Sequence, residues 1–529
     1  MGLLDVAGEA MTGWPVARRV ARRARIASGA LVTMLVCSAH VGSPDAFFEG
    51  VAGPYPVRVI IRSPAVIPAR AEITVRVTGG GVRRVTATPK IWNGGDRGAP
   101  PPDDAVRVPG DSTLWSLRLW IMRQGSYAVL VRVEGDAGNG TAVVPYTAVA
   151  TSVLKMNGAM AVMLSAFGLF LIAGLVTIAG AAAREGTLAP GDEPDAMATR
   201  RARTVRGAAI VVIVVALAGG RAWWVHEDRA YTTALFRPVK AAVTVSTVGA
   251  TARRPGVRAN PGRRILRLAI DSSEASRRAR WAPLVPDHGK LMHLFLVKEG
   301  DLNAIAHLHP LQTDTVSFET ALPPLPAGRY RVFADVVLET GFAETIVADV
   351  SLEAPSNQWV PTDADDAMFL GAGSGSTARF DDGSVLVWTG VTTPHVRLAD
   401  AALSFTLRDA KGAPLAVEPY LGMAAHAVVV RDDDSVYVHL HPAGTASPAA
   451  AQALAAWTPE AVARGAIGDA VDRAQRAMPA MRDTLSGVFS FPYAFPKAGR
   501  YRVWVQFRRG RAIRTGAFDV QVRDARSSS

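Results

Sequence analysis

The amino-acid sequence predicts a mainly β protein with three immunoglobulin-like antiparallel β-sandwich domains, two or three transmembrane helices, and an Ala-rich helical insertion in the third domain. Three observations predict this fold class: short β-branched segments separated by Pro and Gly, a strand motif that occurs three times, and long apolar stretches without charge. Of the 529 residues, 49% are hydrophobic and only 20% are charged. This composition excludes a wholly disordered chain, and the length indicates several folding units.

A glycine–tyrosine strand motif occurs near the end of each predicted sandwich. It begins at Gly125, Gly328 and Gly499, with a tyrosine two residues later and apolar residues after it. Each copy is followed by a turn and one last strand, as in the penultimate strand of a sandwich. The sandwiches are predicted at 46–150, 235–353 and 375–523, with a linker at 354–374.

The third predicted sandwich contains an Ala-rich segment, residues 446–480, whose apolar positions recur every three to four residues. Strong helix formers with this spacing predict one or two amphipathic helices. A flap that caps one end of the sandwich is the first interpretation. A ligand lid or a partner-docking helix is the alternative.

Apolar stretches predict the membrane segments. Residues 156–183 carry no charge and, as a helix, exceed the ~30 Å hydrocarbon core. Residues 207–225 are shorter in apolar length, but Arg221 can snorkel toward the interface. A third apolar segment, 26–39, follows an arginine cluster within residues 1–45 and is typical of a signal peptide or signal anchor.

Arginines beside these segments predict the orientation. Residues 184–206 end in four arginines and are predicted to be a cytoplasmic loop, because such loops carry an excess of Lys and Arg. All three sandwiches then lie outside the cytoplasm, and the predicted location is the bacterial inner (cytoplasmic) membrane. The arginines beside the apolar segments account for much of the net charge of +12. Since no nucleic-acid-binding motif is present, we expect the membrane and no nucleic acid as a partner.

Six of the ten histidines form two matching blocks. Each block has a glycine, three residues, a histidine, a strand–turn–strand stretch and then His-Leu-His-Pro. A β-hairpin turning at Gly300 pairs His293 with His307, and the second block pairs His426 with His439 in the same way. The last histidine of each block lies two residues further along its strand, so it points to the same face. The two predicted patches are His293, His307 and His309, and His426, His439 and His441.

Three imidazoles on one patch suit a His₃ metal site, so all six histidines are candidate ligands. Copper is the first candidate metal outside the cytoplasm, with zinc as the alternative. The single cysteine, Cys37, lies in the predicted export segment and excludes a thiolate site. Two other interpretations stay open: a neutral hydrogen-bonded histidine network, and pH sensing. His288 is a candidate fourth ligand of the first patch, whereas neither Met292 nor Met423 is shared between the blocks.

Motifs of nucleophilic, phosphate-binding and dinucleotide-binding enzymes are not found in the sequence. We therefore expect a binding protein rather than an enzyme. No catalytic residue, organic cofactor or small-molecule substrate is predicted.

The His-Leu-His-Pro blocks and the Gly-Arg-Tyr-Arg-Val strands resemble bacterial exported proteins with YtkA-like β-sandwich domains, which are similar in style to small periplasmic copper-handling domains. The first predicted sandwich resembles the same fold but contains no histidine. The resemblance implies a membrane-anchored extracytoplasmic metal-binding protein that stores, delivers or senses metal, with copper first. The alternative is a structural or scaffolding envelope protein whose sandwiches dock another envelope protein and whose histidine clusters are structural.

Overall fold

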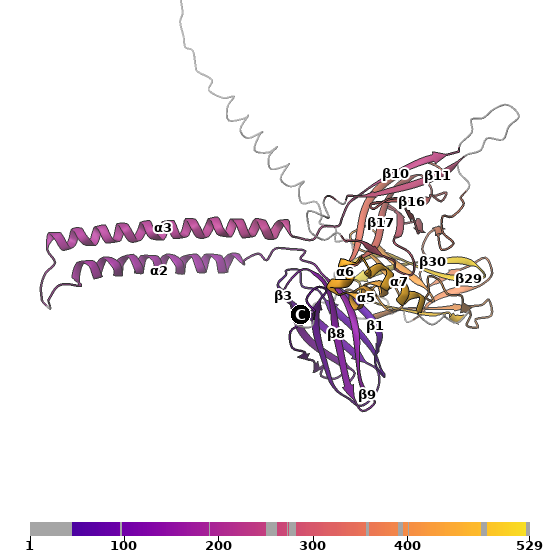
Figure 1. The fold of residues 1–529 in the computed structure, drawn as a ribbon, viewed down its shortest axis with the longest axis horizontal. Helices are drawn as coiled ribbons and strands as arrows, with labels where there is room; N and C mark the ends of the chain where they lie inside the picture. The colour runs from indigo at the N-terminus through magenta and orange to yellow at the C-terminus, as the bar shows by residue number, and fades with distance from the viewer. Residues whose placement is uncertain are drawn as a thin grey trace, which may run out of the picture. The chain divides into compact units, whose positions relative to one another are not determined.

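The computed structural model describes residues 45–95, 98–189, 191–249, 262–271, 273, 282–355, 359–389, 395–399, 401–477 and 484–524. The predicted signal peptide or signal anchor, with Cys37, lies outside the described residues. The described chain is mainly β, with several antiparallel sheets and two long apolar helices (Figure 1). The coarse fold class predicted from the sequence is therefore confirmed.

The sheets of the described chain pack in pairs around separate apolar cores, which we call the N-terminal, central and C-terminal sheet pairs. In the N-terminal pair, apolar residues alternate with exposed ones along most strands, so each sheet has one face in the core. Its first sheet contains β1 (Ala46–Ala52), β2 (Tyr55–Arg62), β3 (Ala69–Val77), β7 (Leu114–Ile121) and β6 (Val106–Arg107). Its second contains β5 (Asp103–Asp104), β4 (Val82–Ile91), β8 (Gly125–Gly135) and β9 (Gly138–Ala148).

The central pair is formed by a small sheet and a larger sheet. The small sheet contains β10 (Ala241–Val248), β11 (Arg263–Ile270), β16 (Ser317–Ala321) and β15 (Leu311–Gln312). The larger sheet contains β12 (Leu284–Val285), β17 (Gly328–Leu338), β13 (His293–Lys298), β14 (Ala304–Leu308) and β19 (Ala367–Leu370), with β18 (Ala343–Leu352) paired to β17. Strand β19 lies inside the range predicted as a linker, so part of that range extends the central sheet.

The C-terminal pair has the same plan. One sheet contains β20 (Thr377–Arg379), β21 (Val385–Thr389), β23 (Ala401–Arg408) and β28 (Val488–Tyr493). The other contains β22 (His395–Val396), β30 (Ala512–Arg523), β29 (Gly499–Arg509), β25 (His426–Arg431) and β26 (Tyr437–Leu440), and a separate two-stranded sheet contains β24 (Ala416–Val417) and β27 (Leu485–Ser486).

The three copies of the glycine–tyrosine motif adopt one local structure. Strands β8, β17 and β29 each begin at the motif glycine, whose φ of 137–141° lies in the region that favours glycine. Each tyrosine hydroxyl donates to the backbone carbonyl four residues earlier: Tyr127 to Arg123 (2.9 Å), Tyr330 to Pro326 (2.9 Å) and Tyr501 to Lys497 (2.7 Å). The motif therefore fixes the start of an equivalent strand in all three sheet pairs.

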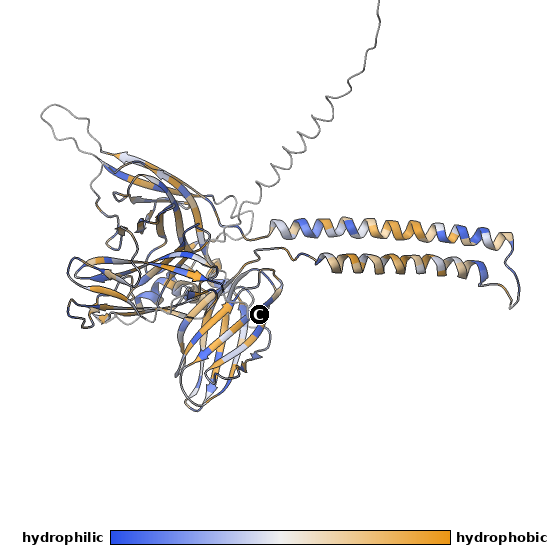
Figure 2. Cartoon of the chain, turned by 180° about the vertical axis from the view of Figure 1, so that it is seen from behind, coloured by the Kyte–Doolittle hydropathy of each residue, from blue (hydrophilic) through white to orange (hydrophobic). Residues whose placement is uncertain are grey.

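Two antiparallel helices, α2 (Gly158–Glu185) and α3 (Ala196–Thr233), are long and apolar enough to cross a membrane. Figure 2 shows hydrophobic residues over most of α2 and the middle of α3. Helix α3 starts within the range predicted as a loop, because Asp195 caps its first turn through Ala198 N (2.6 Å) and the Ala- and Arg-rich residues that follow are strong helix formers.

The Ala-rich insertion forms three short helices, α5 (Pro448–Ala456), α6 (Pro459–Ala463) and α7 (Ile467–Ala477). Their buried residues pack against Val285 of β12 and Val337 of β17, which belong to the central pair. The insertion thus covers an edge of the neighbouring central pair, instead of forming a flap on its own sandwich.

The larger sheets of the central and C-terminal pairs pack against each other through their outer faces. Along β13, Leu294 and Leu296 point into the central core, whereas Phe295 and Val297 join a second apolar cluster with Tyr437 and other residues of the C-terminal pair. Both faces of β13 and β25 are therefore buried, which explains why these strands are continuous apolar runs instead of alternating ones.

Candidate metal centre

The histidine blocks lie on the outer faces that meet between the central and C-terminal pairs. His293 begins β13 and His307 lies in β14, while His426 begins β25 and His439 lies in β26. All three histidines of the first block are at most 2% exposed. The two predicted patches therefore form one buried cluster across the contact between two sheets.

The predicted hairpin register is wrong by two residues. Leu294 pairs with Leu308, so His307 lies opposite Phe295 rather than opposite His293. The reason is that the turn is centred on Asp301 instead of Gly300, with positive φ at both Gly300 and Leu302. The second hairpin is displaced in the same way, with His439 opposite Val428. Because the displacement is two residues, each histidine keeps the face that the alternation predicted.

The structure brings the three histidines of the first block together, and we call them the first set. One ring nitrogen from each of His293, His307 and His309 lies within 4.8 Å of the others. The distance between His293 Nδ1 and His307 Nε2 is 3.2 Å. Two imidazole nitrogens bound tetrahedrally to one ion at ~2.0 Å lie roughly 3.3 Å apart, so this spacing suits a shared metal.

Each histidine of the first set has an oxygen beside its other ring nitrogen. His293 Nε2 lies 3.3 Å from the Asp287 carbonyl. His307 Nδ1 lies 2.9 Å from Gln506 Oε1, and His309 Nδ1 lies 3.1 Å from Asp366 Oδ1. Hydrogen-bond acceptors of this kind orient metal-binding imidazoles in proteins.

These acceptors favour one placement of the protons in the first set. A carbonyl oxygen only accepts, so His293 donates from Nε2, and in a neutral ring its Nδ1 carries a lone pair. The Gln506 amide nitrogen lies 3.2 Å from Thr515 Oγ1, which leaves Oε1 to accept from His307 Nδ1. His307 Nε2 then also carries a lone pair, facing that of His293 at 3.2 Å. Two facing lone pairs repel unless a cation lies between them.

A second set consists of His288, His426 and His441, again with one nitrogen from each within 4.8 Å of the others. His426 and His441 are 1% and 3% exposed, yet neither of their ring nitrogens has a hydrogen-bond partner among the described residues. His288 comes from a loop of the central pair, and its Nε2 lies 3.6 Å from Asp287 Oδ1. The sequence suggested His288 as a ligand of the first patch, whereas it lies with the second.

His439 lies between the two sets. Its Nδ1 is 3.5 Å from Asp335 Oδ2, and its Nε2 has no hydrogen-bond partner among the described residues. Its ring centroid lies 5.3 Å from that of His293, 5.7 Å from His307, 5.5 Å from His426 and 4.6 Å from His441. All six predicted histidines therefore belong to one cluster, with His288 as its seventh member.

Burial favours the neutral form of five histidines of the cluster. It lowers the pKa of His293, His307, His426 and His441 well below the usual value, and the neighbouring imidazoles lower it further. Burial also lowers the pKa of His288. A neutral imidazole is the form that binds metal ions, so the cluster is ready for a cation at neutral pH.

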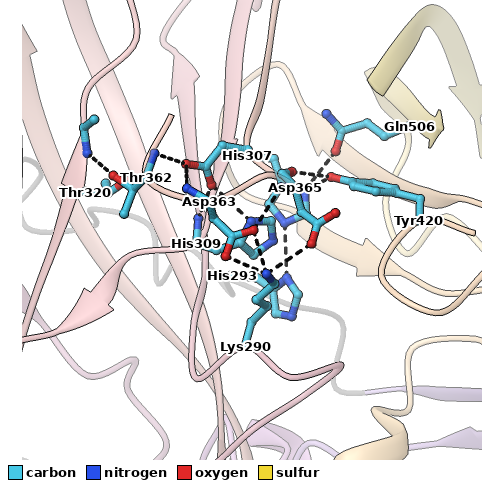
Figure 3. Close-up of polar contacts among 12 residues, drawn as sticks. Lys290, His293, His307, His309, Thr320, Thr362, Asp363, Asp365, Tyr420 and Gln506 are labelled. Atoms are coloured by element: carbon cyan, nitrogen blue, oxygen red, sulfur yellow. Dashed lines mark hydrogen bonds and ion pairs between the residues drawn. The ribbon is translucent and has the colours of Figure 1, made fainter. Parts of the chain in front are cut away.

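Charged residues surround the first set. Lys290 Nζ lies 2.6 Å from both carboxylate oxygens of Asp363 and 3.1 Å from Asp365 (Figure 3). Asp365 also pairs with Arg508 of β29. Tyr420 adds a hydroxyl that donates to the Asp365 carbonyl (3.1 Å) and lies 3.2 Å from His307 Nδ1. These contacts hold residues of the predicted linker against both sheet pairs.

Sequence reasoning did not identify the acceptors Asp287, Asp366 and Gln506. One signal was present for Gln506: it occupies the same place in the glycine–tyrosine motif as Asp335, and each lies in register with the first histidine of its block. The two residues act across the contact, since Gln506 binds His307 of the central pair and Asp335 lies beside His439 of the C-terminal pair.

Residues 259–354 and 382–524 match a protein family described as Domain of unknown function (DUF8832). The match covers the strands that carry both histidine blocks. Among curated proteins, nothing matches the chain.

Similar solved structures include an endo-fucoidan hydrolase variant of glycoside hydrolase family 107, at 9% identity and a TM-score of 0.14, over 88% of this chain and 43% of that one. The native E. coli alpha-2-macroglobulin is 9% identical with a TM-score of 0.17, over 90% of this chain and 22% of that one. An I-band fragment of titin is 8% identical with a TM-score of 0.13, over 87% and 94% of the two chains. This chain spans less than half of the hydrolase, and likenesses this distant carry no argument about function.

Proposed function

We propose that this chain is a membrane-anchored extracytoplasmic metal-binding protein that uses its histidine cluster to store, deliver or sense metal. The observation that supports it most strongly is the 3.2 Å distance between His293 Nδ1 and His307 Nε2, together with the acceptor oxygens on the far sides of both rings, which favour a lone pair on each of these two nitrogens. A bound cation turns this repulsion into attraction. His309 Nε2, which has no hydrogen-bond partner among the described residues, supplies the third donor.

Copper is the proposed metal and zinc the alternative. The donors are imidazole nitrogens, and for such donors the affinity order of divalent ions places Cu(II) above Zn(II). Met292, which precedes His293, does not contribute to the first set, because it points away from it into the central core. The burial of the first set favours slow exchange, which suits storage or sensing better than rapid transfer.

The proposed location is the bacterial inner membrane, anchored by α2 and α3, with three immunoglobulin-like sandwiches outside the cytoplasm. The two apolar helices and the arginines at the start of α3 support this orientation. The three equivalent tyrosine hydrogen bonds support a common sandwich fold. Reporter fusions after residue 529 test the orientation, since cytoplasmic activity of that end contradicts it.

The competing function is a scaffolding envelope protein with a structural histidine network. The observation in its favour is the Tyr420 hydroxyl, 3.2 Å from His307 Nδ1. If Tyr420 donates there instead of to the Asp365 carbonyl, and the Gln506 amide is reversed, His307 donates from Nε2 to His293, and these two rings form a hydrogen-bonded pair that needs no metal. Metal titration separates the two functions.

The test is isothermal titration of the full chain in nanodiscs with Cu(II) and with Zn(II), after removal of metal by a chelator. We expect binding in the wild type and its loss from the first set in the His307→Ala/His309→Ala variant. His226→Gln is the matched control, because His226 is exposed on α3 and distant in sequence from both blocks. Absence of binding in the wild type, or equal binding in the double variant, contradicts the proposal.

A further inference from the structure

We infer that the second set, His288, His426 and His441, is a second metal site, and that the two ions together join the central and C-terminal sheet pairs. The inference rests on the proposed function and deepens it. It replaces one ion on each block-bearing sheet by a two-ion centre between the two sheets, in which His288 takes the place of His439 as a ligand of the second ion.

The first support is the state of the buried nitrogens. Both ring nitrogens of His426 and of His441 lack hydrogen-bond partners among the described residues, as does His288 Nε2. Buried imidazoles in native proteins are paired or bind a ligand, because an unpaired buried polar group is costly. An ion bound by one nitrogen from each of the three rings, which already lie within 4.8 Å of one another, satisfies this need.

The second support is the origin of the donors. His426 and His441 come from the C-terminal pair, whereas His288 comes from the loop before β13 in the central pair. In the matching loop of the C-terminal pair, Leu421 occupies the position of His288, and both residues have the left-handed φ of about 50° (49° and 52°). Only one of the two equivalent loop positions carries a donor, so the second ion alone would be bound by protein ligands of both pairs.

The third support is the helical insertion, which holds the His288 loop in place. Gln475 of α7 accepts from Gly289 N at 3.0 Å and donates to the Pro286 carbonyl at 2.6 Å. These two bonds fix the backbone on both sides of His288. Gln475 is therefore a positioning residue of the second site, which gives the insertion a function other than capping.

His439 connects the two sites. Asp335 lies on its Nδ1 side, and its unpaired Nε2 faces neither a carbonyl nor a carboxylate among the described residues. Its ring is within 5.7 Å, between centroids, of two members of each set. We expect removal of the His439 side chain to lower the affinity for both ions. Removal of a member of one set should lower mainly the affinity for the ion of that set.

The experiment measures metal stoichiometry on the full chain in nanodiscs, by mass spectrometry of the metal after loading with Cu(II) and desalting. The wild type is expected to hold two ions per chain and His288→Leu one, since leucine is tolerated in the equivalent backbone conformation at position 421. Leu421→Met is the matched control and should keep two ions. Gln475→Leu should lower the affinity for the second ion in competition with a chelator while the first ion keeps its affinity.

A second measurement guards against a folding defect. Two Cu(II) ions in neighbouring sites give a dipolar-coupled electron paramagnetic resonance spectrum, and His288→Leu should change it to that of an isolated ion with an unchanged circular dichroism spectrum. One ion in both wild type and His288→Leu, or two in both, overturns the second site only. A chain that binds no ion overturns the proposed function and this inference together.

Discussion

The two His-Leu-His-Pro blocks have the same sequence plan and the same register, but their histidines have different surroundings. In the first set every outer nitrogen faces an oxygen, from Asp287, Gln506 or Asp366. In the second set, His426 and His441 have no hydrogen-bond partner among the described residues. The comparison shows that a repeated ligand motif specifies the positions of the ligands but not the residues that orient them.

The difference comes from the neighbouring strands. Strand β14 is covered by β19, and the residue before β19 is Asp366, which accepts from both the backbone N–H and the ring of His309. The equivalent strand β26 has no such neighbour in its sheet, where it is the edge strand. We therefore expect the first set to bind its ion more tightly. The arrangement of the second set should depend more on the presence of an ion.

Acidification is expected to have the largest effect, because it acts on both sets. Burial lowers the folded-state pKa of four histidines: His293, His307, His426 and His441. In the unfolded chain a histidine has a pKa of about 6.5, so below that pH the unfolded chain binds more protons than the folded chain. The free energy of unfolding of the metal-free protein is therefore highest above that pH. It falls as the pH drops below it, by about 1.4 kcal/mol per pH unit for each histidine. Denaturant unfolding between pH 7.5 and 5 measures this slope.

The control for the pH slope is the metal-loaded protein, whose stability should resist acidification until the ion is released. A slope near zero in the metal-free protein contradicts the buried neutral state of these rings.

The second prediction compares equivalent positions in the two blocks. His309→Ala removes a hydrogen bond to a buried carboxylate, whereas His441→Ala removes a ring without a hydrogen-bond partner in the described structure. In metal-free protein we expect His309→Ala to destabilise by about 1–3 kcal/mol more than His441→Ala. Unfolding midpoints of the two variants measure the difference, and equal losses would remove the distinction between the two surroundings.

The third prediction, with the smallest expected effect, tests how the His307 ring is oriented within the first set. Gln506→Met keeps the approximate size of the side chain but removes the acceptor for His307 Nδ1. We expect the affinity of the first site to fall about tenfold, at the lower end for residues that orient metal ligands, with the second site unchanged. Chelator competition measures both affinities. A decrease of equal size at both sites would show that the substitution disturbs the whole contact.

The sequence predicted the β fold, the two apolar helices and the clustering of each block because these follow from local patterns. The register error did not separate the histidines, since a two-residue displacement preserves the face. What the sequence did not predict depends on contacts between distant segments. His288 joins residues more than a hundred positions away, and Gln506 reaches His307 of another sheet pair.

The continuous apolar runs of β13 and β25 were a sign that both faces of these strands are buried. They did not specify the partner. Patterns in a single sequence therefore located the candidate ligands. The contact between the two outer faces, which brings the two sets together, required the three-dimensional structure.

The most direct test of the central claim is pulsed electron paramagnetic resonance of the full chain loaded with one equivalent of Cu(II). We expect modulation from the remote nitrogens of coordinated imidazoles, retained in His226→Gln and lost from the first set in His307→Ala/His309→Ala. A chain that does not retain copper, or a spectrum without imidazole modulation, would contradict the claim that the first set binds metal.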